Sequence, residues 1–202
     1  LVGDMGGGAM MLAYGIVCAL FESQRSQRGQ VVDAAISSGA SLISTMYYAL
    51  MKQNLWNLER GANLLDGGAP FYGCYRCADD KFIAIGAIEP QFYKLLVELC
   101  GVQDQDLFKE QMNRDLWPAQ KAAWTELFLS KTQAEWCEIL EGTDACVSPV
   151  LDFDEAVNYG HHQARNSFQT IDGIDCPAPG PILSRTPAQA GEVAAAGAHS
   201  QE

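Results

Sequence analysis

Basic residues are scarce in this chain. Its 202 residues include 13 Lys and Arg against 25 Asp and Glu, and the formal net charge is −12 at pH 7. Nucleic acids and anionic membranes attract proteins through clustered positive charge, so this balance argues against both as partners. Histidine is also rare, and His161, His162 and His199 lack the i, i+4 spacing of helical zinc ligands. We therefore expect no metal site.

The sequence also has no apolar run of bilayer length. Residues 9–21 are apolar but are interrupted by Gly15 and fall short of the ~20 residues that a spanning helix needs. A core helix buried on all sides explains this segment better than a signal peptide or a membrane span.

The cysteines do not form a disulfide or zinc pattern. They are seven, an odd number, and they are scattered through apolar segments. Cys74 and Cys77 have CxxC spacing but no second pair or nearby histidine, which argues against a zinc site. We expect reduced, packed thiols and a cytoplasmic protein.

Apolar residues make up 48% of the chain, enough for a substantial core. Their spacing predicts a mixed α/β protein. The predicted helices cover 10–21, 34–52, 90–100, 118–129, 132–140 and 153–159 (the last able to continue to 165), and the predicted strands cover 31–32, 71–77, 81–88 and 145–150. Residues 78–80 have the length of a short hairpin connection between the second and third strands, and Thr132 with Glu135 has capping-box spacing. Residues 176–181 form a proline-rich connection. Residues 54–70, rich in Gly, Asn and Asp, indicate an ordered functional loop or a domain crossing.

Glu89 ends a predicted buried strand and is followed at once by Pro90. A strand that delivers a carboxylate to the mouth of a fold suggests catalysis. Pro90 also suits the first position of a helix, so Glu89 can equally be the cap of that helix. Both roles are compatible.

Asp4 precedes Gly6, Gly7 and Gly8 at the start of an apolar helix. Glycines allow close approach of a ligand, and a helix N-terminus offers N–H groups to an oxyanion. The alternative is an Asp N-cap on a tightly packed helix. The string is not GxGxxG and lacks a P-loop lysine, which excludes a nucleotide phosphate loop.

Residues 64–72 read LLDGGAPFY and place Asp66, Gly67 and Gly68 before a strand that carries Tyr72. Such a loop can line a pocket with backbone groups and aromatic faces. On local grounds a plain turn is favoured.

Four strings, GDMGGGAMMLAYGIVCALFE, RGQVVDAAI, RGANLLDGGAPFY and GAIEPQFY, together resemble the family III CoA-transferases, specifically the alpha-methylacyl-CoA racemase branch. The resemblance covers residues 1–187. It implies part of a Rossmann-like large domain plus a smaller α+β domain, in an interlocked homodimer with active sites between subunits. The implied segments are 1–34 (large domain), 35–65 (crossing helix and linker), 66–150 (small domain) and 151–187 (return to the large domain). Ala and Gly dominate residues 188–202 without periodicity, so we expect a flexible tail there.

The resemblance also implies residue roles. Asp4 is one of two acid/base groups that invert the α-carbon of a 2-methylacyl-CoA thioester through an enolate, and Glu89 supports the histidine that is the other. We take the N–H groups of Gly6, Gly7 and Gly8 as candidates to hold the enolate oxygen. The other substrate contacts are Leu65, Asp66, Gly67, Gly68, Tyr72 and Ile88, and no metal or cofactor is needed.

The sequence departs from the family in one respect. In family members the histidine, and most residues that hold the CoA nucleotide, lie upstream of the Asp-Gly run, whereas this chain begins three residues before Asp4. We therefore expect the later part of a longer enzyme, inactive alone. The alternatives are a CoA-transferase in which Asp4 attacks the thioester, and a noncatalytic interaction module.

Overall fold

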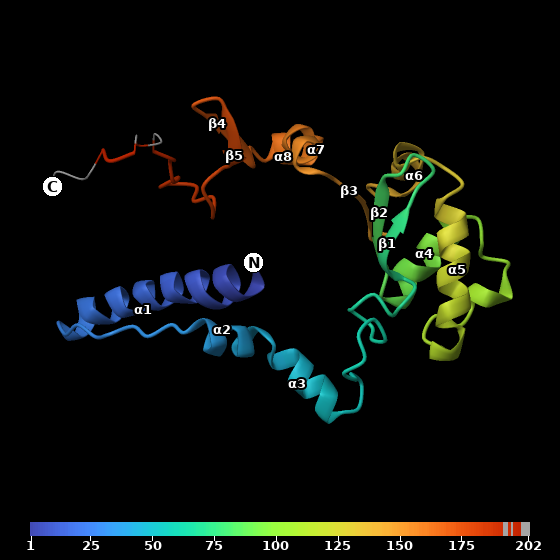
Figure 1. Ribbon diagram of the computed structural model, residues 1–202, viewed down its shortest axis with the longest axis horizontal. Helices are drawn as coiled ribbons and strands as arrows, with labels where there is room; N and C mark the ends of the chain where they lie inside the picture. Colours follow the sequence, from blue (N-terminus) through green and yellow to red (C-terminus); the bar gives the residue numbers. More distant parts are fainter. Residues whose placement is uncertain (192–193, 195, 199–202) are drawn as a thin grey trace. The chain divides into compact units, whose positions relative to one another are not determined.

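The computed structural model describes residues 1–191, 194 and 196–198, so His199 and part of the expected tail lie outside the described residues. Figure 1 labels most of the elements along the chain. Their bounds are η1 Val2–Met10, α1 Met11–Ser26, α2 Ile36–Ile43, α3 Thr45–Lys52, β1 Tyr72–Arg76, β2 Phe82–Gly86, α4 Pro90–Leu99, η2 Asp106–Phe108, η3 Arg114–Leu116, α5 Trp117–Phe128, α6 Gln133–Leu140, β3 Val147–Val150, α7 Phe153–Asn158, α8 Gly160–Ala164, β4 Phe168–Ile171 and β5 Ile174–Pro177.

The chain divides into two units. The first consists of Leu1–Gly73 and Met112–Lys121, and the second of Cys74–Gln111 and Ala122–Glu202. The domain boundaries implied by the family resemblance stay a prediction.

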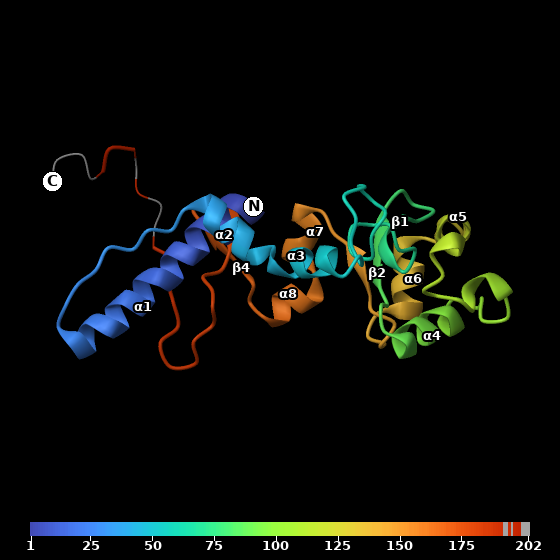
Figure 2. The same cartoon turned by 90° about the horizontal axis from the view of Figure 1, so that it is seen from below.

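In the first unit, the π-helical segment η1 runs directly into α1, and α2 packs across η1 (Figure 2). Two glycines make this crossing close. A Cβ on Gly39 would lie 1.8 Å from the carbonyl oxygen of Gly7, and one on Gly7 would lie 2.6 Å from the backbone nitrogen of Ala40. Because these neighbours are backbone atoms, no rotamer change could make room.

The sequence predicts that the first helix is buried on all sides. Within the described residues this prediction is wrong. No residue of α1 is buried, and Tyr14 and Phe21 are 70% and 65% exposed. Only Gly7 and Gly8 of the preceding segment are buried, because α2 covers one short stretch of it. By length and composition the continuous helix Val2–Ser26 could cross a membrane, although core helices and signal sequences pass the same test.

Two further predictions in this unit need correction. Helix 34–52 is two helices, α2 and α3, separated at Ser44, whose hydroxyl donates to the carbonyl oxygen of Ala40 at 2.8 Å. Such back-bonding competes with the regular helical ladder. Val31 and Val32 have no strand partner in the described residues and lie in a connection without regular structure.

The second unit holds a three-stranded sheet in the order β1-β2-β3, in which β2 and β3 are antiparallel. The predicted hairpin is confirmed: the Cys77 N–H donates to the Lys81 carbonyl at 2.8 Å, and Asp80 takes a positive φ in the turn. Beside the sheet, ring contacts join Phe108, Trp124, Phe128 and Trp136 at centroid distances of 4.8 to 5.6 Å. This cluster is almost completely buried and forms the core.

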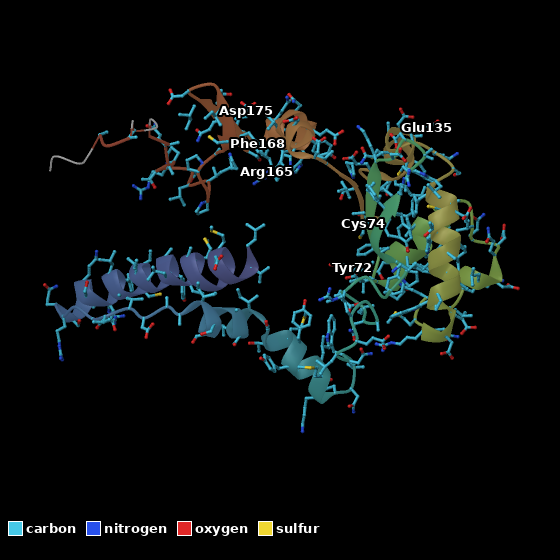
Figure 3. The ribbon with its side chains drawn as sticks, in the orientation of Figure 1. Tyr72, Cys74, Glu135, Arg165, Phe168 and Asp175 are labelled. Carbon is cyan, nitrogen blue, oxygen red and sulfur yellow. The ribbon has the colours of Figure 1, made fainter. Side chains whose placement is uncertain are left out.

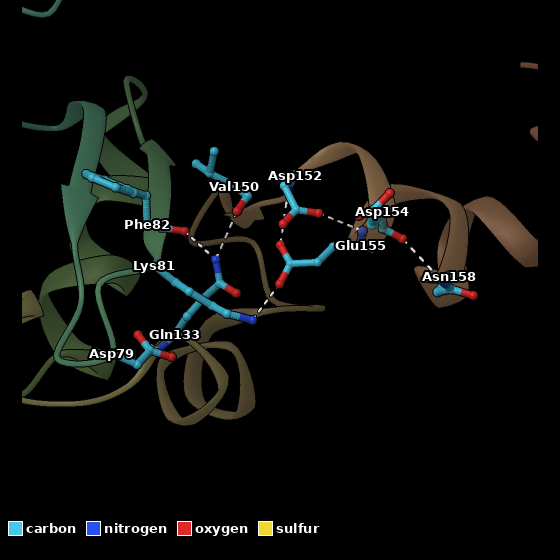
Figure 4. A network of polar contacts seen from close by, with 9 residues as sticks. All are labelled: Asp79, Lys81, Phe82, Gln133, Val150, Asp152, Asp154, Glu155 and Asn158. Atoms are coloured by element: carbon cyan, nitrogen blue, oxygen red, sulfur yellow. Dashed lines mark hydrogen bonds and ion pairs between the residues drawn. The ribbon is translucent and has the colours of Figure 1, made fainter. Parts of the chain in front are cut away.

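Helix α6 is tied to the sheet by the buried side chain of Gln133. Its Nε2 donates to the carbonyl oxygens of Phe82 and Val150, which belong to neighbouring strands (Figure 4). The predicted capping box of Thr132 and Glu135 at the start of α6 is confirmed.

After β3, helix α7 begins with a second capping box, formed by Asp152 and Glu155, and Glu155 also pairs with Lys81 (Figure 4). Strands β4 and β5 then form a hairpin that was not predicted. The signal was present, since the turn is Asp172-Gly173, both with positive φ. β5 reaches Pro177 and so takes up the start of the expected proline-rich connection.

Candidate functional site

Asp4 lies on the exposed side of η1 in the first unit. The expectation that Gly6, Gly7 and Gly8 form a helix N-terminus is wrong, because the helix already begins at Val2 and the Gly6 N–H donates to the Leu1 carbonyl at 3.1 Å. In the described structure the glycines serve the contact with α2. Their role toward a substrate, and that of Asp4, stay predictions.

The loop before β1 is ordered by one amide and one carboxylate. The side chain of Asn63, 1% exposed, accepts from the Asn57 N–H at 2.8 Å and donates to the carbonyls of Asn57 and Glu59. Its Nδ2 also donates to Asp66 at 2.8 Å. The prediction of an ordered loop is confirmed.

Asp66 is the acceptor at the centre of this loop. Its carboxylate accepts from the backbone N–H groups of Gly61, Asn63 and Gly68 at 2.8 to 3.2 Å. Desolvation raises the pKa of the Asp66 carboxyl, but the hydrogen bond from the Asn63 amide and those from the backbone N–H groups outweigh it and hold the pKa below its usual value. Asp66 therefore organises the loop for which the family resemblance implies substrate binding.

Gly67 and Gly68 shape the end of the loop. In the sequence, Leu65 precedes these glycines and Tyr72 follows them. Gly67 has φ of +90°, and a Cβ on Gly68 would lie 2.6 Å from the Asn63 carbonyl oxygen. Tyr72 starts β1, its N–H donates to the Ala69 carbonyl at 3.1 Å, and its side chain is half-buried (Figure 3). Leu65 is also half-buried, so the loop keeps accessible side chains.

Glu89 occupies the N-cap position of α4 in the second unit, three residues after β2 ends at Gly86. Its carbonyl accepts from the N–H groups of Phe92 and Tyr93 at 3.0 Å, whereas its side chain makes no capping hydrogen bond. The capping role is thus performed by the backbone. The carboxylate is exposed, and it stays available for another task.

Gln111 holds the backbone that leads to Glu89. Its buried amide donates to the carbonyls of Ala87 and Ile88, each at 2.9 Å. The sequence analysis missed this residue, because a contact between residues more than 20 positions apart leaves no local pattern. Ile88, predicted to touch substrate, is half-buried beside this anchor.

Cys146 lies near Glu89. Its carbonyl accepts from the Gly86 N–H at 2.9 Å, which joins the end of β2 to the start of β3. Partial burial, and then the negative charges of Glu89 and Asp144, raise the pKa of the Cys146 thiol. An exposed but protonated thiol therefore flanks the predicted site.

The remaining histidines and cysteines differ in their exposure. His161 is exposed, while His162 is half-buried against Phe168 at a ring distance of 5.5 Å. Cys77 is buried, which raises its pKa to about 11. Cys18, Cys74 and Cys146 are exposed, so the expectation of packed thiols is wrong for these three. Within the part of the chain that the structure describes, no group of three or more His, Cys, Asp and Glu side chains could hold a metal.

The structure thus places the predicted residues in two sets. The first unit contains Asp4, the three glycines after it, and the loop from Leu65 to Tyr72. The second unit contains Ile88 and Glu89.

Comparisons with known proteins match nearly the whole chain. The model of CoA-transferase family III matches residues 1–200. The alpha-methylacyl-CoA racemases of Mus musculus and Homo sapiens are each 48% identical over 93% of this chain and 49% of their own length. The chain therefore spans about half the length of the curated relatives it matches.

A crystal structure of Rv3272 from Mycobacterium tuberculosis has the same fold, with a TM-score of 0.68 and 18% identity over 89% of this chain and 48% of that one. The expected family and its fold are confirmed. The interlocked dimer stays a prediction.

Proposed function

Because the chain belongs to CoA-transferase family III, we propose that it supplies Asp4 and Glu89 to a racemase acting on 2-methylacyl-CoA thioesters. The observation that carries the proposal is the 48% identity to two alpha-methylacyl-CoA racemases over nearly the whole chain. The 18% identity to the solved structure of Rv3272 is far lower, and that likeness supports the fold alone.

Proton transfer at the α-carbon of a thioester suits an exposed carboxylate such as that of Asp4. A thioester acidifies its α C–H bond, so one base can remove that proton and leave an enolate. A second group then returns a proton to the opposite face of the carbon, which inverts it. Asp4 serves one face, and a histidine serves the other without a metal or flavin.

Glu89 acts on that histidine rather than on the substrate. A carboxylate that accepts from an imidazole N–H fixes the ring's orientation and favours its protonated form. The Glu89 side chain is exposed and is not used for capping, which supports this role. Gln111 holds the two preceding carbonyls and so keeps Glu89 in place.

The test is a chimera in which this chain replaces the matching segment of the mouse racemase, so that the rest of the relative's length is supplied. We expect the chimera to exchange the α-proton of 2-methylacyl-CoA with solvent deuterium. Because positioned acid/base groups contribute ~10²–10⁴-fold, Asp4→Asn should slow inversion of the α-carbon at least 100-fold, while the histidine still exchanges the proton on its own face. A folded chimera without exchange, or one whose rate of inversion is unaffected by Asp4→Asn, would overturn the proposal.

Two further variants separate the roles. Glu89→Gln should lower the pKa seen in the pH profile of exchange, because the histidine loses a negative neighbour. Lys94→Gln, on the same helix, is the control and should leave the profile unchanged. Isolation of an acyl adduct on Asp4 during turnover would instead identify a CoA-transferase mechanism.

A further inference from the structure

The peptide group between Gly67 and Gly68 is held at both of its polar atoms. The Gly67 carbonyl oxygen accepts from Nζ of Lys121 at 2.6 Å, and the Gly68 N–H donates to Oδ1 of Asp66 at 3.2 Å. Because a peptide group is planar, fixing both atoms fixes the orientation of the whole plane. All four residues belong to the first unit.

Without these two contacts the Gly67–Gly68 peptide would rotate freely. It lies between two glycines, which have no Cβ to restrict their backbone dihedral angles. Neither glycine can give way to a stiffer residue, since Gly67 has φ of +90° and a Cβ on Gly68 would lie 2.6 Å from the Asn63 carbonyl oxygen. The ammonium of Lys121 therefore supplies a restraint that the loop's own side chains cannot supply.

Lys121 reaches the loop from one face of a helix. The helical turn η3 runs directly into α5, and the spacings of three and four residues place Arg114, Trp117 and Lys121 on the same face. Trp117 is 5% exposed and packs edge-on against Phe71 at 5.9 Å. This face is thereby fixed against the residue that precedes Tyr72.

Arg114 adds a weaker contact at the start of the loop. Its guanidinium carbon lies 5.3 Å from the centre of the Trp117 ring, and Nη2 donates to the Leu55 carbonyl at 3.4 Å. Short charge-assisted hydrogen bonds are the strong ones, so the 2.6 Å contact of Lys121 restrains the loop more than this one does.

Close packing does not join the loop to this helix face. Residues of both line a cavity of about 370 Å³, namely Gly61, Ala62, Gly68, Arg114, Trp117, Pro118 and Lys121. The position of the loop beside the cavity therefore depends on polar contacts that reach across, and the contact of Lys121 is the shorter of the two described above.

We propose that Lys121 is a positioning residue for the substrate, an assignment that rests on the proposed function. Lys121 locks the Gly67–Gly68 peptide and so sets the backbone between Leu65 and Tyr72, for which the family resemblance implies substrate contacts. Both of these side chains are half-buried, so a substrate can reach them while the backbone between them is held. Lys121 acts through the loop and not on the reacting atoms.

The first experiment measures amide hydrogen exchange of the 202-residue chain by NMR. The N–H groups of Gly61, Asn63 and Gly68 donate to Asp66, so their exchange rates report the order of the loop. Lys121→Met removes the ammonium and keeps an apolar stem. It should speed exchange of the Gly68 amide about tenfold, since hydrogen bonds to charged groups are the strong ones.

Three further variants give the comparison its controls. Lys121→Arg keeps a cationic donor and should restore slow exchange of the Gly68 amide, and Arg114→Met should have a smaller effect than Lys121→Met. Lys94→Met removes an exposed lysine of the second unit and should leave the loop amides unchanged.

The second experiment measures steady-state kinetics of the chimera with the mouse racemase. Lys121→Met should raise KM for 2-methylacyl-CoA about tenfold and leave kcat nearly unchanged, because a mobile loop weakens binding of the ground state and the transition state alike. Lys121→Arg should restore KM. A loss of folded protein would instead lower the apparent kcat at constant KM, so this split separates positioning from stability.

Each contrary result is decisive. Unchanged exchange of the Gly68 amide in Lys121→Met, or equally fast exchange in Lys121→Arg, would overturn the lock on the peptide. Faster amide exchange with an unchanged KM would overturn the positioning role. A chimera that is inactive in every form, together with the expected amide exchange, would reject the racemase proposal and leave the lock standing.

Discussion

Helices α1 and α4 are both rich in apolar side chains but differ in what surrounds them. In α4 the apolar residues form a stripe, and Tyr93, Leu96 and Val97 are buried while Lys94 faces solvent. In α1 apolar residues surround the helix, and none is buried. The α4 sequence is matched to one covered face, whereas the α1 sequence is typical of a helix with neighbours on several sides.

The two units differ in the same way. The second unit buries its aromatic cluster against its own sheet, so its stability is accounted for by contacts within the chain. The first unit depends on one close crossing, on the hydrogen-bonded Asp66 loop and on the packing of Phe71 with Trp117. Local sequence is therefore a good guide to structure only where the partners of an element are also local.

The largest expected effect comes from removing a ring from the core. Trp124→Ala should lower the free energy of unfolding by about 3–5 kcal/mol, because Trp124 is completely buried between Phe108 and Phe128. Leu20→Ala in α1 should change it by less than about 0.5 kcal/mol, because Leu20 is 59% exposed. Urea unfolding followed by far-UV circular dichroism measures both. Equal losses would show that α1 is covered in solution, as the predicted dimer requires.

A smaller effect is expected at the helix crossing. Gly39→Ala should cost about 1–3 kcal/mol, because the new methyl would collide with the Gly7 carbonyl and force α2 away from η1. Hydrogen exchange of the η1 and α2 amides should lose protection while the second unit is unchanged. Gly160→Ala is the control, since a Cβ there meets nothing within 4 Å. A stabilising Gly39→Ala would disprove the close crossing, because Ala is the better helix former.

The smallest effect is the pH dependence of the Asp66 loop. The folded pKa of Asp66 lies below its usual value of 3.8, so its stabilisation is complete above that value and is lost as the pH falls through the folded pKa. Asp66→Asn should cost about 1–2 kcal/mol at neutral pH through lost charge-assisted bonds and should flatten the acid limb of the stability curve. Circular dichroism melts from pH 7 to pH 2 test this. An unchanged acid limb would mean that another carboxyl controls it.

These contrasts explain which parts of the fold could be predicted. The hairpin of β1 and β2, the start of α4 at Pro90 and the capping box at Thr132 are encoded in a few adjacent residues, and the structure has all three. The Asp172-Gly173 turn was equally local and was overlooked. The break at Ser44 arises from one hydroxyl in an otherwise continuous apolar pattern.

The candidate site divides similarly. Glu89 and the Asp66 loop were recognised from short strings, and the structure shows an exposed carboxylate and an ordered loop there. Gln111 was not recognised, because its partners, the carbonyls of Ala87 and Ile88, lie far away in the sequence. Only a folded chain brings such donors to the carbonyls they bind.

The crossing of Gly7 and Gly39 has one more consequence. Many packed pairs tolerate change by exchange, since a larger residue on one side can be balanced by a smaller one on the other. Here both partners are already the smallest residue, and the contact is between backbones. Neither position can compensate for the other. A diverging sequence must therefore either keep both glycines or lose the close crossing of η1 and α2.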